Sequence, residues 1–167
     1  MADPAPIVIR RATTADLPAV GRLGALLIRE HHEFDRQRFI PATAQSEPAY
    51  ASFLGRQLAQ ASVVVLVAER GGEVVGYTYA GVESYDYMSL RGPAGVLYDI
   101  VVDPEHRGHG IGRLLLERTL ASLAEHRVPR VVLSTAERNI AAQQLFASAG
   151  FRRTMIEMTR ELADGGS

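Results

Sequence analysis

The spacing of apolar residues changes along the chain, and each change predicts where a strand gives way to a helix. Residues 7–12 (IVIRRA) are rich in β-branched side chains, which predicts a strand. Residues 13–34 then carry apolar side chains three or four positions apart, the spacing of one buried helical face, with Thr13 or Thr14 as the N-cap. The apolar positions of this predicted helix are Leu17, Val20, Leu23 and Leu27.

Further along, the pattern predicts a second helix and then a hairpin. Pro48 lies in the first turn of a predicted helix over 46–60, where proline is tolerated. Residues 62–83 contain two β-branched runs joined by Gly71 and Gly72, which predicts a β-hairpin. The later elements are a loop over 84–95, a strand over 96–102, a helix from about 110 through 123, a strand over 130–136, a helix over 140–149 that Gly150 ends, and a last strand over 151–162.

Composition indicates that these elements form one globular unit. The chain has 167 residues, 47% hydrophobic and 22% charged, which predicts a single domain over 1–167 with an ordered core at about 7–162. The net charge is -1 and the arginines are scattered, so neither nucleic acid nor a membrane surface is an expected partner. No apolar run approaches the roughly 20 residues that span a bilayer, and no leader is visible, so we expect a cytoplasmic protein. The absence of cysteine excludes thiolate metal sites and a cysteine nucleophile.

The stretch HRGHGIGRLLLE, residues 106–117, places three glycines where a helix is predicted to begin. Gly108, Gly110 and Gly112 are poor helix formers, so helix stability does not explain them. Backbone N–H groups at a helix N-terminus bind anions, and glycines keep side chains out of the way. We therefore expect a phosphate-bearing ligand. A dinucleotide fingerprint needs a glycine where Arg113 stands, and the Gly-Lys pair of a Walker loop is absent.

Two stretches resemble the signatures of the GCN5-related N-acetyltransferases. Residues 107–112 match the R-x-x-G-x-G pyrophosphate motif of that family. The family's second signature is similar to NIAAQQLFASAGF, residues 139–151, and both stretches occur in the family's order. The resemblance implies an α/β fold with a mixed, mostly antiparallel central sheet, a splayed parallel strand pair and flanking helices. The residues that carry the second signature are Asn139, Ala142, Leu145, Phe146, Gly150 and Phe151.

The resemblance also implies acetyl-CoA as co-substrate and a place for it. In the family, the pantetheine arm pairs with the backbone of one splayed strand, which here is the segment Ile100, Val101 and Val102. Arg107 would help to set the loop, Asn139 would contact the cofactor, and Phe146 would line the channel. The backbone amides expected to hold the pyrophosphate are those of Gly108, His109, Gly110, Ile111, Gly112 and Arg113.

Acyl transfer to an amine needs a group that takes a proton and a donor for the oxyanion. Asp99 lies just before the cofactor-pairing segment and is the first candidate for the base; its structural alternative is an ion pair or a strand-end hydrogen bond. Glu83 and Tyr98 are the next candidates, although Glu83 is equally well explained as a solvated charge. The family's usual oxyanion donor is a backbone amide, here that of Val102 or its neighbour. His106 and His109 lie at the phosphate end of the predicted site, so we interpret them as loop or phosphate contacts.

One position departs from the family pattern. Many members have a tyrosine at position 146 that protonates the departing thiolate, and Phe146 cannot do so. Tyr98 or Tyr79 is then the expected substitute. Members that acetylate a ribosomal protein carry a glutamate where Ser134 stands, which argues against that subfamily.

The acceptor is the least defined part of the prediction. A primary amine of a small molecule or peptide would meet Glu30, Glu33, Tyr85 and Tyr87, through charge and cation–π contacts. A metal site at His31 and His32 is disfavoured, because adjacent helical positions point apart, and no metal is predicted. Two classes stay open: an acetyl-CoA-dependent N-acetyltransferase, or a non-catalytic acyl-CoA-binding or sensing module. The apolar tail and the resemblance also suggest a homodimer.

Overall fold

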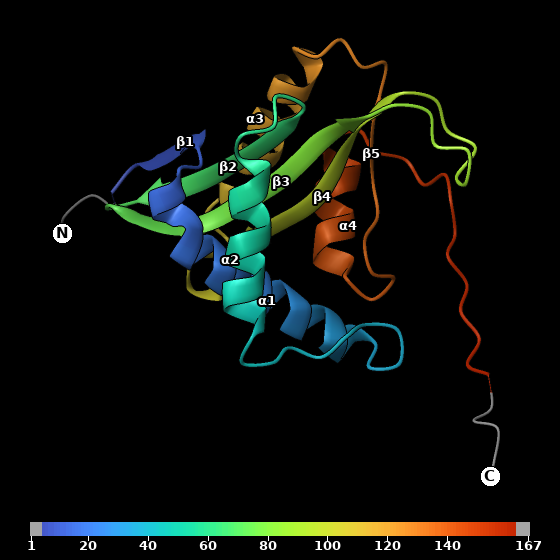
Figure 1. The fold of residues 1–167 in the computed structure, drawn as a ribbon, viewed down its shortest axis with the longest axis horizontal. Helices are drawn as coiled ribbons and strands as arrows, with labels where there is room; N and C mark the ends of the chain where they lie inside the picture. The colour runs from blue at the N-terminus through green and yellow to red at the C-terminus, as the bar shows by residue number, and fades with distance from the viewer. Residues whose placement is uncertain (1–4, 163–167) are drawn as a thin grey trace.

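The computed structural model describes residues 5–162, which fold around one five-stranded sheet in the order β1-β2-β3-β4-β5 (Figure 1). Neighbouring strands run antiparallel except for β4 and β5, which are parallel. The mixed, mostly antiparallel sheet predicted from the sequence is therefore confirmed. The strands are β1 (Ile7–Arg11), β2 (Val63–Arg70), β3 (Glu73–Glu83), β4 (Ala94–Val102) and β5 (Val131–Leu133).

Helices cover both faces of the sheet (Figure 1). α1 and α2 pack together against one face, and α3 packs against the other. None of the helices described in residues 5–162 is long and apolar enough to cross a membrane. The helices are α1 (Leu17–Phe34), α2 (Ser46–Gln57), α3 (Ile111–Ala124) and α4 (Ile140–Ser148), with short 3-10 turns η1 (Thr14–Asp16) and η2 (Pro104–His106).

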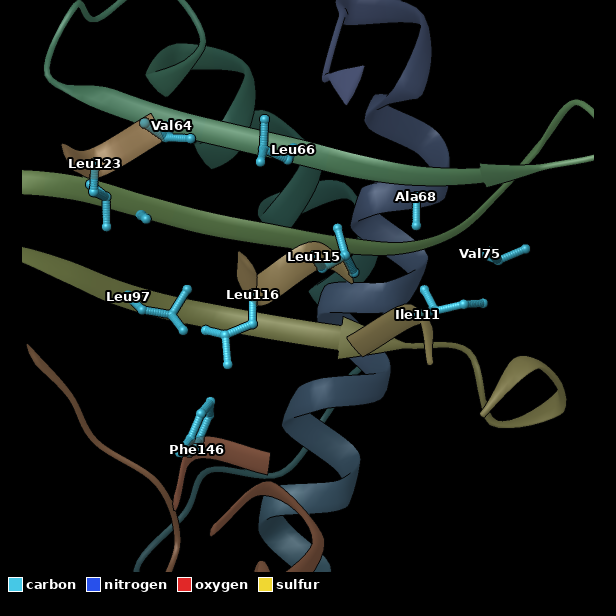
Figure 2. Packing of buried hydrophobic residues seen from close by; sticks show 11 residues of the cluster. Val64, Leu66, Ala68, Val75, Leu97, Ile111, Leu115, Leu116, Leu123 and Phe146 are labelled. Atoms are coloured by element: carbon cyan, nitrogen blue, oxygen red, sulfur yellow. The ribbon is translucent and has the colours of Figure 1, made fainter. Parts of the chain in front are cut away.

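Strand alternation divides the apolar side chains between two cores. Leu66 of β2 lies under α3 with Leu115 and Leu116, whereas its neighbour Val67 faces α1 and α2 with Tyr77 of β3. Figure 2 shows the α3 core, with Phe146 of α4 beyond β4 at one side of it. The sheet is thus buried on both faces, and its strands carry long apolar runs.

The start of α1 is fixed by a polar cluster at its N-terminus. The backbone N–H of Thr13 donates to Asp16 at 2.7 Å, and Arg10 of β1 donates to both Asp16 oxygens at 2.8 and 2.9 Å. The Arg10 guanidinium holds the pKa of the buried Asp16 carboxyl at about 2. This cluster ties the first strand to the first helix.

The sequence predicted most element positions correctly but one element wrongly. α2 ends at Gln57 rather than 60, and β5 spans only Val131–Leu133 of the predicted 130–136. The predicted last strand over 151–162 is not formed: the segment is extended but pairs with no strand in the described chain. An alternating pattern supplies a strand's apolar face, but a strand also needs a backbone partner, which this segment lacks within one copy.

Candidate active site

The parallel strands β4 and β5 stay together for only three residue pairs. Pairing runs from Gly95 with Val131 to Leu97 with Leu133, and β4 continues to Val102 without β5 beside it. Residues 98–102 of β4 and 133–135 from the end of β5 line the two sides of one cleft of about 1060 Å³. Beyond Leu97, the edge of β4 that faced β5 is therefore unpaired and faces the cleft.

A β-bulge at Tyr98 turns the next residue toward α1 and α2. Asp99 pairs with Tyr79 of β3, whereas Leu97 pairs with Ala80, so Tyr98 is an extra residue in β4. Leu97 packs into the α3 core, and the shift puts Asp99 on the opposite face. Without the extra residue, alternation would place Leu97 and Asp99 on the same face.

The carboxylate of Asp99 is held by one buried and one half-buried tyrosine. Tyr50 of α2 donates to Asp99 Oδ2 at 2.5 Å, and Tyr77 of β3 donates to the same oxygen at 3.1 Å. Burial raises the pKa of Asp99 above its ordinary range, while the two hydroxyl donors and the charge of a protonated His31 act in the opposite sense. Burial and the Asp99 charge also raise the pKa of Tyr50 and Tyr77, so both hydroxyls stay protonated.

No sequence signal pointed to Tyr50 or Tyr77, because the contacts with Asp99 span 49 and 22 positions of the chain. The ring of Tyr50 lies on α1 directly over Gly24. A Cβ at Gly24 would come within 2.2 Å of that ring. The glycine therefore lets α2 approach closely enough for its tyrosine to reach β4.

The glycine loop after β4 forms one end of the cleft. Gly108 and Gly110 have φ values of +79° and +77°, a conformation that favours glycine. No heavy atom outside the adjoining chain lies within 4 Å of where a Cβ would stand at either glycine, so the space above the loop is open. α3 begins at once with Ile111, which aims its first backbone N–H groups toward this space.

Arg107 fastens this loop to two other elements. Its Nε donates to the carbonyl of Val102 at 2.9 Å, and its terminal nitrogen bonds Glu30 of α1 at 2.6 Å. These contacts tie the loop to β4 and α1. The second contact also pairs the carboxylate of Glu30 with the Arg107 guanidinium.

The opposite wall of the cleft comes from the residues after β5. Asn139 is the N-cap of α4 and accepts from the N–H of Ala142 at 3.1 Å, which leaves its amide nitrogen available. Phe146 is buried and its ring centroid lies 5.9 Å from that of Phe151. Both Asn139 and Phe146 line the cleft.

The far end of the cleft is mostly apolar and contains one histidine. Leu27, Phe34, Phe39 and Ile40 line it together with His31. The ring of His31 is fixed edge-on against Phe34 and Phe39, with centroids 5.7 and 5.0 Å away. Its Nδ1 lies 2.9 Å from the carbonyl of Leu27, so Nδ1 carries the hydrogen and Nε2 of the neutral ring is the acceptor. Nε2 has no hydrogen-bond partner among residues 5–162 and is not fully buried.

Of the predicted site residues, Glu83, Tyr85, Tyr87 and His109 do not line this cleft, and Tyr98 and Glu33 line it with their polar groups paired to other side chains. Tyr98 lines its edge, but its hydroxyl donates to Glu83 at 2.7 Å, and Arg91 bonds the other Glu83 oxygen at 2.5 Å. Tyr85 and Tyr87 stack in a separate hollow beside Glu83, with centroids 6.2 Å apart. The substrate roles of these two tyrosines stay predictions. Glu33 lines the cleft and is paired on the surface with Arg36, and no group of metal-binding side chains occurs among the described residues.

Known proteins are similar to this chain in sequence and in fold. Residues 27–151 match the family described as the acetyltransferase (GNAT) family. A mycothiol acetyltransferase of Thermobispora bispora is 38% identical over 92 residues, which are 55% of this chain and 31% of that protein. The matched segment covers about three tenths of the length of this and the next curated relatives.

Two solved structures agree with the fold. A mutant of the BH1408 protein from Bacillus halodurans superposes with a TM-score of 0.79 and 23% identity over 93% of this chain and 99% of that chain. A predicted acetyltransferase from Clostridium acetobutylicum, solved with acetyl-CoA, gives a TM-score of 0.68 and 18% identity over 92% of this chain and 96% of that chain.

Proposed function

The chain belongs to the acetyltransferase (GNAT) family, and from this premise we propose that it transfers the acetyl group of acetyl-CoA to a primary amine of a small molecule or peptide. The proposed transfer is a direct attack by the amine, without an acyl-enzyme. One observation carries the proposal: a single cleft joins the free edge of β4, the glycine loop at the start of α3 and an end that holds His31.

The loop fits the pyrophosphate of coenzyme A. Positive φ and open space at Gly108 and Gly110 leave a cradle that a Cβ would fill, and the positive end of a 14-residue helix faces it. Arg107 acts on the loop rather than on phosphate, because its guanidinium already bonds Val102 and Glu30. The amides assigned to phosphate are those of Gly108, His109, Gly110, Ile111, Gly112 and Arg113.

The free edge of β4 fits the pantetheine arm, which carries the thioester to the reacting end. We assign the pairing to the backbone of Ile100, Val101 and Val102. The N–H of Asp103 donates to Val75 of β3 at 2.8 Å, so alternation directs the N–H of Val102 to the opposite edge, toward the cleft. That amide is our oxyanion donor. Asn139 and Phe146 supply the facing wall.

We assign removal of the amine proton to His31. His31 lines the cleft and its Nε2 is an acceptor, whereas Oδ2 of Asp99 already accepts from two tyrosine hydroxyls. Asp99, the base expected from the sequence, is held by the hydroxyls of Tyr50 and Tyr77 and is given no proton-transfer step in this proposal. Tyr98 and Glu83 bond each other beside the bulge, so they receive no proton-transfer step.

The acceptor end favours an amine with an apolar or aromatic body. Leu27, Phe34, Phe39 and Ile40 line it, beside the paired carboxylates of Glu30 and Glu33. Glu30, which the sequence predicted to attract a cation, is paired with Arg107 at 2.6 Å. We therefore expect arylalkyl amines and peptides with an apolar first residue to be better acceptors than polyamines.

Calorimetric titration with acetyl-CoA tests the first half of the proposal, with ATP and NAD as controls. Saturable binding of acetyl-CoA alone is the expected result, and absence of binding would refute the proposal. Release of free coenzyme A thiol across a panel of arylalkyl amines, amino sugars, polyamines and peptides tests the second half.

Phe146 supports a second candidate, a non-catalytic module that binds or senses acyl-CoA. Its side chain has no hydroxyl to protonate a departing thiolate, so catalysis requires sulfur to leave as the anion, which a thiol with a pKa near 8.5 permits. Tight acetyl-CoA binding with no thiol release for any acceptor in the panel would favour the module. Thiol release with a matching acetylated product would exclude it.

A further inference from the structure

Arg138 joins two walls of the cleft at the acceptor end. It lies in the loop between β5 and α4, which comes close to the C-terminal end of α1 (Figure 1). One terminal nitrogen of its guanidinium donates to the carbonyl of Phe34, the last residue of α1, at 2.9 Å. Both residues line the cleft. The bond therefore holds a guanidinium beside the apolar surface assigned to the acceptor.

No carboxylate within residues 5–162 pairs with this guanidinium. The two glutamates of the acceptor end have other partners, because Glu30 bonds Arg107 at 2.6 Å and Glu33 bonds Arg36 at 2.8 Å. Arg138 forms no ion pair in this part of the chain, and the bond to a carbonyl uses only one of its N–H donors. Its side chain is exposed, so the remaining donors are available to a ligand.

The loop that carries Arg138 is held in place by hydrogen bonds at its base. The amide of Gln143 in α4 donates to the carbonyls of Ala136 and Glu137 at 3.2 and 2.7 Å. Asn139, the next residue after Arg138, caps α4. The guanidinium is thus anchored at both its backbone and its tip, which lowers the entropy that a ligand loses on binding to it.

The other arginine of the cleft without a carboxylate partner lies at the phosphate end. Arg113, in the first turn of α3, bonds the hydroxyl of Ser148 at 3.1 Å. Arg138 instead lies beside Phe34, whose ring centroid is 5.7 Å from that of His31. His31 and Phe34 are three positions apart on α1, a rise of about 4.5 Å along the helix. Arg138 is therefore grouped with the acceptor and not with the cofactor phosphates.

We propose that Arg138 binds a carboxylate of the acceptor, so that the preferred acceptor is an amino acid with an apolar or aromatic side chain. The inference rests on the proposed function and narrows its primary amine to this class. A guanidinium fork matches the two oxygens of a carboxylate. The carboxylate would lie on Arg138, the side chain against Phe39 and Ile40, and the amine toward His31. One carbon separates amine and carboxylate in an amino acid, so a hydrogen bond at each end spans the turn between His31 and Phe34.

Three acceptors that share an amine and a phenyl ring test the proposal by thiol release. L-Phenylalanine has the carboxylate, whereas L-phenylalaninamide and phenylethylamine lack it. We expect kcat/KM for L-phenylalanine to exceed both others at least tenfold. Arg138→Gln should raise KM for L-phenylalanine by about 10–100-fold and leave KM for the other two within about twofold. Glutamine keeps an N–H donor for the Phe34 carbonyl but has no charge.

Arg130→Gln is the matched control. Arg130 is exposed at the start of β5 and does not line the cleft, so the variant loses the same charge outside the site. It should leave KM for all three acceptors unchanged. If Arg138→Gln raised KM equally for the three, Arg138 would only fasten the end of α1, and the proposal would be overturned.

Calorimetric titration of L-phenylalanine into the protein saturated with coenzyme A separates this inference from the proposed function. Saturable binding that Arg138→Gln loses and Arg130→Gln keeps would support the carboxylate site, whether or not thiol is released. Turnover of the amide and of phenylethylamine with no preference for L-phenylalanine would sink the carboxylate site and leave acetyl transfer standing. The proposal also fails if the unsubstituted protein binds no L-phenylalanine.

Discussion

The hydroxyl of Tyr50 on α2 donates a 2.5 Å hydrogen bond to Asp99 on β4, and this bond joins the first helical layer to the cleft. Tyr50→Phe removes a donor to a half-buried carboxylate, which costs about 1.5–3 kcal/mol of unfolding free energy. Urea unfolding at neutral pH measures this loss of unfolding free energy. Tyr79→Phe is the control, because the Tyr79 hydroxyl makes no hydrogen bond to Asp99. Equal losses in the two variants would contradict the assignment.

The same variant has a pH dependence of defined sign. Burial raises the folded pKa of Asp99 above its unfolded value, so between those values the folded state holds the extra proton and stability falls as pH rises. Tyr50→Phe removes a bond that favours the ionised form, which raises that pKa further. The stability gap between the variant and the unsubstituted protein should therefore narrow as pH falls through this window. A constant gap would mean that Asp99 does not titrate in this way.

The contribution of Asp16 to stability depends on pH with the opposite sign. The bond from Arg10 lowers its folded pKa to about 2, so its contribution is present at neutral pH and is lost as pH falls from about 4 to about 2. Asp16→Asn should cost about 2 kcal/mol at pH 7 and about half of that near pH 3. Glu69→Gln is the matched control: Glu69 bonds the same guanidinium but is 30% exposed, so its loss should stay below about 1 kcal/mol.

Two substitutions at Gly110 distinguish the effect of charge at the loop from the effect of backbone strain. Aspartate and asparagine both tolerate positive φ and have nearly the same shape, so Gly110→Asp and Gly110→Asn differ mainly in charge. If phosphate lies over the loop, Asp should weaken acetyl-CoA binding at least tenfold more than Asn, as measured by calorimetry. Similar affinities for the two variants would place the phosphate elsewhere.

His31 and His32 form a natural pair for testing the base. Both have Nδ1 bonded to a carbonyl, and of the two only His31 lines the cleft. Asparagine can keep the donor at Nδ1 and lacks the acceptor at Nε2. We expect His31→Asn to lower kcat 10²–10⁴-fold with KM nearly unchanged, and His32→Asn to have little effect.

Chemical rescue distinguishes proton transfer from support of the fold. Free imidazole should restore part of the activity of His31→Ala, which leaves room for it, and should not affect His32→Ala. Normal turnover in His31→Asn would return the role of base to Asp99 or another group.

Most residues predicted to bind the cofactor lie around one cleft of the structure. The glycine loop, Asn139 and Phe146 line one cleft as expected, because they follow strands whose ends meet at one edge of the sheet. The residues predicted for the acceptor agree less well with the structure. Tyr85 and Tyr87 share a loop that lies in a separate hollow, while His31, considered in the sequence only as a metal ligand, faces the cleft.

The sequence by itself determined the elements and the loop, since apolar spacing, helix caps and glycines at positive φ act over a few neighbouring residues. Only the tertiary structure decided the environment of Asp99. An extra residue at Tyr98 rotates it to the other face of β4, and Gly24 lets α2 bring Tyr50 to it across 49 positions. Neither event leaves a local pattern, because each depends on how far two packed elements approach one another. The segment 151–162 makes the same point: its alternating pattern is in the sequence, but it forms no strand in the described fold.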